Sequence, residues 1–119
     1  GGGGRGGGQG AALEGNTSKG TIAILDVQYG NIWTSIPAEL FKQLGLAYGD
    51  KINVSIYHNK TKVYQGTMPY AATFGAVPEG KPLAYFNSLL QLSFALNMGD
   101  FSGTYKVYSG SDWRVEVRK

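Results

Sequence analysis

The sequence predicts an all-β domain, mainly antiparallel, folded as a small barrel or as two packed sheets with one short helix. Two observations carry this prediction. Beyond residue 20, about seven short segments are β-branched or alternate apolar with polar residues, which is the period of a half-buried strand. Clusters of glycine, asparagine and aspartate separate these segments, as turns between strands do. Closure into a barrel would also remove exposed sheet edges.

Composition limits the class of protein. The chain has 119 residues, enough for one domain, and its first 20 residues are half glycine. We therefore expect a flexible leader or linker over residues 1–20 and a barrel domain over residues 21–119. The leader lacks the apolar core of a signal peptide and no run is as long as a membrane span, so we expect a cytoplasmic protein.

Several kinds of site find no support in the composition. The chain has no cysteine and a single histidine, His58, which argues against thiolate chemistry, a histidine-based metal site and a serine–histidine pair. We therefore expect no bound metal. The net charge of +3 is mild, and the chain lacks the dense basic stripe of a dedicated nucleic-acid binder.

The first half of the domain is predicted from five segments. A β-branched strand at Thr21–Leu25 precedes a glycine-asparagine turn, and alternation resumes in a strand at Ile32–Ile36. Proline at the first position and glycine after the last predict a short helix at Pro37–Leu44. An amphipathic strand follows at Lys51–Tyr57, and His58–Thr61 is predicted to be a solvated hairpin tip.

The second half has weaker signals and more loop. A loop rich in glycine and proline is expected at Ala71–Pro82, and Trp113 is expected in the core because it is in phase with the valines that follow it. The remaining expected elements are strands at Lys62–Gln65, Leu83–Phe86, Leu90–Leu96, Thr104–Tyr108 and Trp113–Val117, a polar loop with room for one helical turn at Asn97–Gly103, and a turn at Ser109–Asp112.

The turn between the first two strands carries the densest set of chemically capable side chains. A bend there can aim Asp26, Tyr29, Asn31 and Trp33 into one hollow. A carboxamide matches the donor and acceptor on the adenine edge, an aromatic ring can stack on a base, and a carboxylate can hold an ammonium or a ribose hydroxyl. This set therefore suits a nucleoside-like ligand.

A purely structural interpretation of the same residues stands beside the functional one. Asp26 and Asn31 can bond their own backbone in a turn, while both rings pack in the core. Phe74, an apolar ring in a glycine-proline loop, either plugs the core or forms one wall of a site.

Four segments resemble, in order, the C-terminal domain of the S-adenosylmethionine (SAM) hydroxide adenosyltransferases, a group that includes fluorinase and chlorinase. They are DVQYGNIWTSIP, TFGAVPEGKPL, YFNSLLQLSFALN and GSDWRVEV, and the resemblance covers nearly all of residues 20–119. It implies a small Greek-key β-barrel. It also implies a larger N-terminal α/β domain, and homotrimers in which each site lies between one subunit's N-terminal domain and a neighbour's C-terminal domain.

The resemblance implies a role in SAM binding for particular residues. Tyr29 and Phe74 match rings on the two faces of adenine, and Asn31 matches the carboxamide that binds its edge. A segment that meets adenine through main-chain groups matches Leu96, Asn97 and Met98.

The resemblance implies that a second group of residues binds the methionine half of SAM. Asp26 matches the acid that holds the amino group, Trp33 matches a tryptophan lining the site, and Ser88 matches a serine at the carboxylate. Two positions depart from the family pattern. Leu89 stands where halogenating members often have an arginine that binds the carboxylate, and Ser35 stands where an asparagine is frequent.

The resemblance further implies that the chain is the ligand-binding half of an enzyme. The acid, base and arginine that activate water belong to the N-terminal domain, so we expect no catalytic residue in this chain, no turnover by it alone, and no cofactor beyond SAM as substrate. The nucleophile would be hydroxide or halide, and hydroxide is the better expectation.

Two other functions remain open. One is a stand-alone barrel that binds a nucleotide or single-stranded nucleic acid through exposed aromatic rings. The other is an oligomerising barrel that has lost its ligand. Nucleic acid is the weaker expectation, because the aromatic residues cluster with Asp26 and not with lysines.

Overall fold

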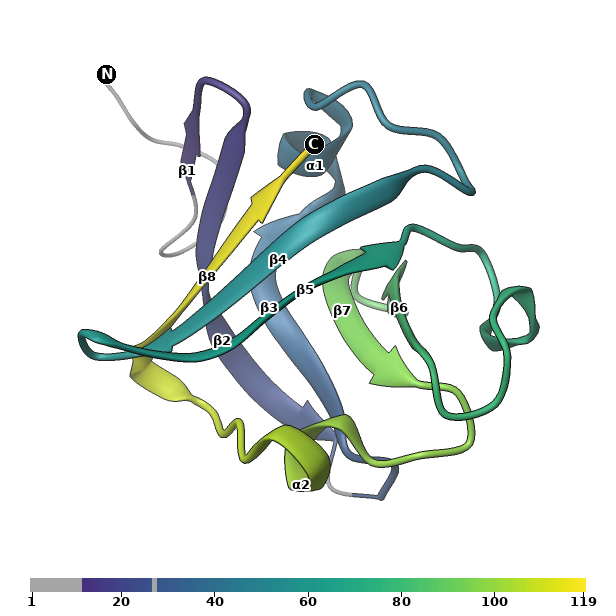
Figure 1. Ribbon diagram of the computed structural model, residues 1–119. Helices are drawn as coiled ribbons and strands as arrows, with labels where there is room; N and C mark the ends of the chain where they lie inside the picture. The colour runs from purple at the N-terminus through teal and green to yellow at the C-terminus, as the bar shows by residue number, and fades with distance from the viewer. Residues whose placement is uncertain (1–11, 27) are drawn as a thin grey trace.

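A computed structural model describes residues 12–26 and 28–119 of the chain, and its strands wrap around one core (Figure 1). The elements are β1 (Ala12–Glu14), β2 (Thr17–Asp26), β3 (Asn31–Pro37), α1 (Ala38–Lys42), β4 (Lys51–His58), β5 (Thr61–Pro69), the 3-10 helix η1 (Phe74–Ala76), β6 (Pro82–Phe86), β7 (Gln91–Leu96), α2 (Phe101–Tyr105) and β8 (Gly110–Arg118).

The strands form a nearly closed antiparallel barrel. Seven of them follow the order β5-β4-β8-β2-β3-β7-β6, and β1 adds to β2 outside this path. Within this seven-strand path, three pairs are hairpins of consecutive strands, whereas β8 returns from the end of the chain to lie between β4 and β2. This return gives the barrel its Greek-key character, and the predicted fold class is confirmed.

One seam of the barrel has no continuous ladder. The path begins at β5 and ends at β6, and no ladder pairs these two strands; an isolated bridge joins Tyr70, the residue after β5, to Ala84 of β6. There the amide nitrogen of Ala71 donates to the carbonyl oxygen of Ala84 at 2.9 Å. The connection that spans this seam is the loop that carries η1.

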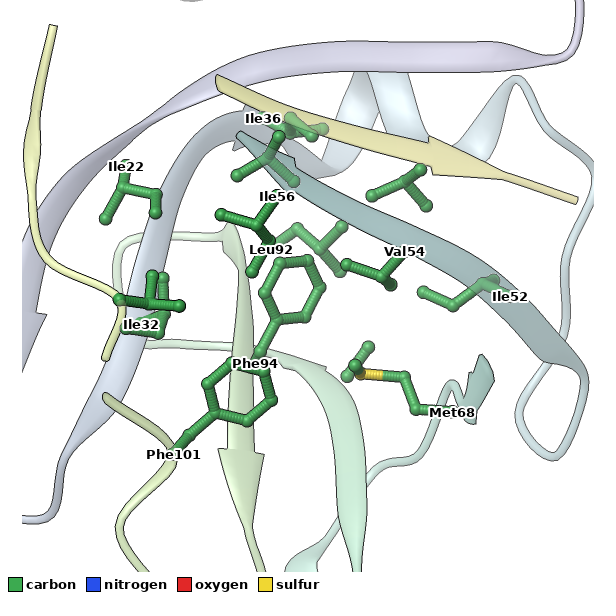
Figure 2. Packing of buried hydrophobic residues seen from close by; sticks show 14 of the residues in the cluster. Ile22, Ile32, Ile36, Ile52, Val54, Ile56, Met68, Leu92, Phe94 and Phe101 are labelled. Carbon is green, nitrogen blue, oxygen red and sulfur yellow. The ribbon is translucent and has the colours of Figure 1, made fainter. Parts of the chain in front are cut away.

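The core fills the inside of the barrel with the inward-facing apolar residues of its strands (Figure 2). Ile52, Val54 and Ile56 of β4 are fully buried, as the alternation predicts, and so are Phe94 of β7 and Phe101 of α2. Trp113 is buried, which confirms its predicted place in the core. Its ring also stacks on His58, which lies at the end of the β4–β5 hairpin and keeps 43 % of its side chain exposed.

Strand β7 is buried on both faces. Leu92, Phe94 and Leu96 face the core, yet Ser93 and Ala95 between them are also fully buried. The second face is covered because Ala71 and Val77 of the η1 loop, together with Leu83 and Ala95, form a small separate cluster outside the barrel. The η1 loop is therefore anchored to the sheet by its own apolar contacts.

The strand predicted at Thr104–Tyr108 is wrong: a second short helix, α2, extends to Tyr105, and Lys106–Ser109 form no strand. The start of α2 lies in the loop at Asn97–Gly103, where one helical turn was expected. Asp100 caps this helix by accepting a hydrogen bond from the Gly103 nitrogen at 2.9 Å. Lys106 ends it in the left-handed conformation. Phe101 is completely buried, so tertiary packing stabilises a helix whose glycine and threonine have poor helix propensity.

The other expected elements form, with shifted bounds. β2 starts at Thr17, before the strand predicted from Thr21, and β8 starts at Gly110, inside the predicted turn. Most of the expected leader, residues 1–11, lies outside the described residues, as does Val27. Within the described part, none of the helices is long and apolar enough to cross a membrane.

Candidate functional site

A tight turn joins β2 to β3 and brings Asp26 opposite Asn31. The carbonyl oxygen of Asp26 accepts hydrogen bonds from the amide nitrogens of Tyr29, at 3.1 Å, and Gly30, at 2.6 Å. Asp26 and Asn31 are cross-strand partners, so their side chains leave the sheet on the same face. Trp33, two residues beyond Asn31 on β3, shares that face. The predicted bend therefore forms, and the two residues do not diverge.

The segment before α2 closes against this turn. Gly30 has φ 73°, and a Cβ at that position would overlap the carboxylate of Asp100. The amide nitrogen of Ser102 also donates to the carbonyl oxygen of Gly30 at 2.9 Å. Glycine is required here both for its backbone conformation and for the close approach of a neighbouring segment.

A hollow of about 490 Å³ opens between the turn, the end of β7 and the η1 loop, and we call it the Asn31 pocket. Six of the nine predicted binding residues line it. The full lining is Gln28, Tyr29, Gly30, Asn31, Phe74, Leu96, Asn97, Met98, Gly99 and Asp100. The pocket therefore joins residues from three parts of the chain that sequence reasoning placed in one site.

Two aromatic rings with exposed surface belong to the pocket. Tyr29 is 58 % exposed and Phe74 is 37 % exposed, so neither ring plugs the core. The Phe74 ring packs edge-on against Tyr85 with 5.2 Å between the ring centroids. Phe74 is thus held from behind while part of its surface remains open to the pocket.

Asn97 fastens the η1 loop to the end of β7. Its side-chain nitrogen donates to the carbonyl oxygen of Val77 at 2.8 Å. Its main-chain oxygen accepts from Gly80 at 2.7 Å, and its main-chain nitrogen donates to Lys81 at 3.0 Å. Asn97 is therefore committed to holding the loop that carries Phe74. Met98, which is exposed and has φ 61°, is the neighbour that faces solvent.

Asn31 is only 5 % exposed, and its side-chain nitrogen donates to the hydroxyl of Tyr85 at 3.0 Å. Burial raises the pKa of Tyr85, hydrogen-bonding groups of Trp33, Asn31 and Ser93 partly offset that rise, and the nearby Asp26 carboxylate adds to it. The hydroxyl is therefore protonated at neutral pH.

Asp26 and Trp33 lie beside the Asn31 pocket and are absent from its lining. Trp33 is half-buried on β3, and its indole nitrogen is buried without a hydrogen-bond partner of good geometry among the described residues. Both residues adjoin Tyr85, as the causes of its pKa shift indicate. They lie on the sheet face that continues from the pocket toward β6.

Ser88 is absent from the pocket lining, although its neighbour Asn87 bonds Ser93, the cross-strand partner of Trp33. It sits in the turn between β6 and β7, at the start of β7, whereas the pocket is at the other end of that strand. Six strand residues separate the two ends, which is about 20 Å. Leu89 beside it is exposed, and Asn87 forms the turn by accepting from the amide nitrogens of Leu89 and Gln91.

Sequence reasoning missed several members of this site. Gln28, Gly30, Gly99 and Asp100 line the pocket without having been predicted, and Tyr85 supports Asn31 from β6. Gln28 and Gly30 lie within the turn that was singled out, so that signal was present. Asp100 reaches the turn only through the fold, and the sequence predicts a polar loop there.

The described residues contain no group of three or more histidine, cysteine or acidic side chains that could hold a metal ion. Three ion pairs join described residues, and all three lie at exposed positions away from the pocket: Lys19–Glu14, His58–Asp112 and Arg114–Glu116. The pocket's chemistry therefore comes from amide, aromatic and main-chain groups with the carboxylate of Asp100.

Comparison with known families bears on this geometry. Residues 20–114 match the family model described as the SAM hydroxide adenosyltransferase C-terminal domain. The chain belongs to this family. SAM is the substrate that the family is named for, and the resemblance drawn from the sequence is confirmed.

Two relatives of this adenosyltransferase domain are called fluorinase. The protein from Actinopolyspora mzabensis is 32 % identical over 103 residues, covering 86 % of this chain and 33 % of its own. The protein from Nocardia brasiliensis is 28 % identical over 99 residues, covering 82 % of this chain and 32 % of its own. The chain thus spans about a third of the length of these relatives.

Solved structures share the fold. An uncharacterized conserved protein from Thermotoga maritima superposes with a TM-score of 0.82 at 28 % identity, covering 93 % of this chain and 39 % of that one. A conserved hypothetical protein from Thermus thermophilus gives a TM-score of 0.52 at 26 % identity, covering 84 % and 34 %. In both, the matched region is a minor part of a longer chain.

Proposed function

We propose that this chain is the SAM-binding C-terminal domain of an adenosyltransferase that is completed by an N-terminal domain. The observation that carries the proposal is the Asn31 pocket. In a member of this family, it brings a buried carboxamide together with two partly exposed aromatic rings. Those groups suit adenine, whose edge carries a donor and an acceptor and whose faces stack on aromatic rings.

The methionine half of SAM has fewer partners in this chain. Asp26 lies next to the pocket and supplies a carboxylate for the ammonium group. Ser88 is about 20 Å from the pocket end of β7, so a ligand reaching both would follow the outer face of β3, β7 and β6. Leu89 offers no charge for the carboxylate. We propose that the completing domain supplies that contact.

The proposed reaction is displacement at C5′ of SAM. Water attacks C5′, the C5′–sulfur bond breaks, and its electron pair stays on the sulfur of methionine, while C5′ gains a hydroxyl and a proton is released. A halide would attack in the same way without that proton. The positive sulfur already activates the bond, so the protein mainly aligns the reactants and excludes bulk water. This chain would hold the adenosyl group.

The completing domain would come from another subunit, in a homotrimer as the family resemblance implies. Thr17 pairs with Arg118 at one end of β2, and Asp26 adjoins the pocket at the other end. Thr17 and Asp26 are the two ends of the ten-residue strand β2, nine residue steps or about 30 Å apart. A domain preceding β2 would therefore join its own chain far from the pocket. This geometry supports a site shared between subunits.

Titration of the 15N-labelled chain with SAM and with adenosine tests the proposal. We expect shifts confined to Tyr29–Asn31, Phe74 and Met98, and a loss of binding of tenfold or more in Asn31→Ala, because its carboxamide makes the specific contact. Asn53→Ala on the outer face of β4 is the matched control and should bind normally. Shifts spread evenly over the barrel would contradict the assignment.

Turnover is the second test. The purified chain alone should convert no SAM to adenosine and methionine, because the water-activating groups are expected on the completing domain. Steady release of adenosine that disappears in Asn31→Ala would show that this chain carries its own catalytic groups.

A single-stranded nucleic-acid module is the second candidate, and one observation favours it. On the outer face of β4 and β8, the Tyr57 ring lies 4.4 Å from the Arg114 guanidinium and 5.7 Å from the Lys62 ammonium. A bound strand would shift these residues and leave Phe74 unaffected, and its affinity would fall steeply with salt. SAM and adenosine would then have no effect.

A further inference from the structure

The carboxamide of Asn31 can face its pocket in two ways. Its oxygen is an acceptor and its nitrogen carries two donor hydrogens, and half a turn exchanges them. A purine with an exocyclic amino group needs the oxygen, whereas one with an exocyclic oxo group needs the nitrogen. An interaction that fixes the orientation of the Asn31 carboxamide therefore determines whether the pocket prefers an amino or an oxo purine.

A hydrogen bond to Tyr85 occupies the side-chain nitrogen of Asn31. The Asn31 Nδ2 donates to the Tyr85 hydroxyl at 3.0 Å, and Asn31 is nearly inaccessible to water that could compete. Among the described residues, no hydrogen bond occupies the Asn31 Oδ1, and Asn31 lines the pocket. The oxygen is thus the group left to meet a ligand.

A hydroxyl can accept or donate, so its own neighbours decide which way it acts. Trp33, Ser93 and Tyr85 are direct neighbours across β3, β7 and β6. The buried indole nitrogen of Trp33 can only donate, so it competes for a lone pair of the hydroxyl and not for its hydrogen. The hydroxyl of Ser93 already donates to the carbonyl oxygen of Gln91 at 3.1 Å, which leaves it an acceptor for the Tyr85 hydrogen. This arrangement favours Tyr85 as the acceptor from Asn31.

We propose that Tyr85 is a positioning residue that turns the Asn31 oxygen toward the pocket and so makes the site prefer 6-aminopurine over 6-oxopurine nucleosides. The inference rests on the proposed function, since it assumes a purine nucleoside in the Asn31 pocket. Removing only the hydroxyl isolates the effect, because Tyr85→Phe keeps the ring that packs against Phe74.

The test compares adenosine with inosine as probes. These differ at the exocyclic group and at the adjacent ring nitrogen. We expect the wild-type chain to bind adenosine about tenfold or more tighter than inosine, since an unmatched buried polar group costs roughly that factor. In Tyr85→Phe the ratio should fall about fivefold, toward equal binding, because the amide is free to turn. Tyr57→Phe, on the far face of the barrel, should keep the wild-type ratio.

A ligand-free measurement accompanies the titration. The side-chain amide signals of Asn31 should shift in the 15N spectrum of Tyr85→Phe, because the nitrogen loses its acceptor. Equal weakening of both nucleosides in Tyr85→Phe, or an unchanged ratio, would overturn the inference and leave the proposed function standing. Binding of neither nucleoside by the wild-type chain would overturn the proposed function and this inference with it.

Discussion

Gly30 connects the pocket to the barrel at the scale of a single residue. It supplies the left-handed conformation of the turn, its carbonyl oxygen accepts from Ser102, and its missing side chain makes room for Asp100. A residue with a side chain would have an unfavourable backbone conformation at this position and would overlap Asp100. The turn that carries Tyr29 and Asn31 is therefore held in place by the segment before α2.

Gly30→Ala should destabilise the chain by about 2–4 kcal/mol, because the new Cβ meets both an unfavourable φ and the Asp100 segment. Urea unfolding followed by tryptophan fluorescence measures this change. Gly75→Ala is the matched control, since a Cβ there meets open space, and its effect should stay within about 0.5 kcal/mol. A Gly30→Ala chain as stable as the control would show that the Asp100 segment moves aside without loss of stability.

Tyr64 gives a prediction for alkaline pH. Burial, with a smaller contribution from Tyr105, raises its pKa from 10.0 to about 12. A folded pKa above the unfolded one means that stability is complete below pH 10 and is lost as pH rises toward 12. Wild type should therefore lose more stability over that range than Tyr64→Phe, by on the order of 1 kcal/mol. Urea titrations at pH 9 and pH 11.5 measure the difference, and parallel losses would contradict it.

Individual residues also show what local sequence can and cannot reveal. Tyr29, Asn31 and Phe74 were predicted because each breaks an otherwise ordinary turn or loop pattern. Tyr85 was not, because it reads as one more strand residue and its hydrogen-bond partner is 54 positions away. Nothing local marks a side chain whose role is to hold another.

Helices and strands, like single residues, are predicted correctly where local sequence determines them and incorrectly where distant contacts do. The strands with clear alternation, β4 and β7, form where the pattern predicts them, because their inner faces build the core. Helix α2 overlaps the helical turn expected within Asn97–Gly103 but extends to Tyr105, where a strand was expected. Phe-Ser-Gly-Thr-Tyr has little helix propensity, and the burial of Phe101 stabilises the helix. Ala95, on the outer face of β7, is buried because the η1 loop covers it, which the alternation of β7 alone does not predict.

The turn between β6 and β7 depends on Asn87 and not on Ser88. The buried Asn87 side chain accepts from Leu89 at 2.8 Å and Gln91 at 3.2 Å, and donates to Ser93 at 3.1 Å. Asn87→Ala should cost about 2–3 kcal/mol, since it leaves these groups without partners. Ser88→Ala, exposed next to it, should cost under about 0.5 kcal/mol. Thermal and urea unfolding of both variants measures this, and similar losses would contradict it.

The whole molecule depends on one strand that closes it. β8 is paired on both sides, with β4 and with β2, and carries the buried Trp113, Val115 and Val117. Alternation and turn spacing report strands and their inner faces, so they predicted a small barrel or two packed sheets, and the family resemblance implied the barrel. The strand order and the place of β8 between two earlier strands depend on distant pairings, which alternation alone does not encode.

Amide hydrogen exchange should reveal the difference between the paired core and the seam. Amide protons of Val115 and Val117, inside a ladder with neighbours on both sides, should exchange only on global unfolding. The amide proton of Ala71, bonded to Ala84 at the isolated bridge, should exchange at least tenfold faster. Equal protection at both places would show that β5 and β6 are joined as firmly as the other strands.

The open seam has a consequence for the ligand proposed for the Asn31 pocket. The two aromatic walls of the Asn31 pocket are mounted differently: Tyr29 is on a hairpin between fully paired strands, and Phe74 is on the connection that crosses from β5 to β6. A slight parting of those two strands would swing the Phe74 wall outward and leave the Asn31 side stationary. For the nucleoside of the proposed function, we therefore expect entry on the Phe74 side of the pocket.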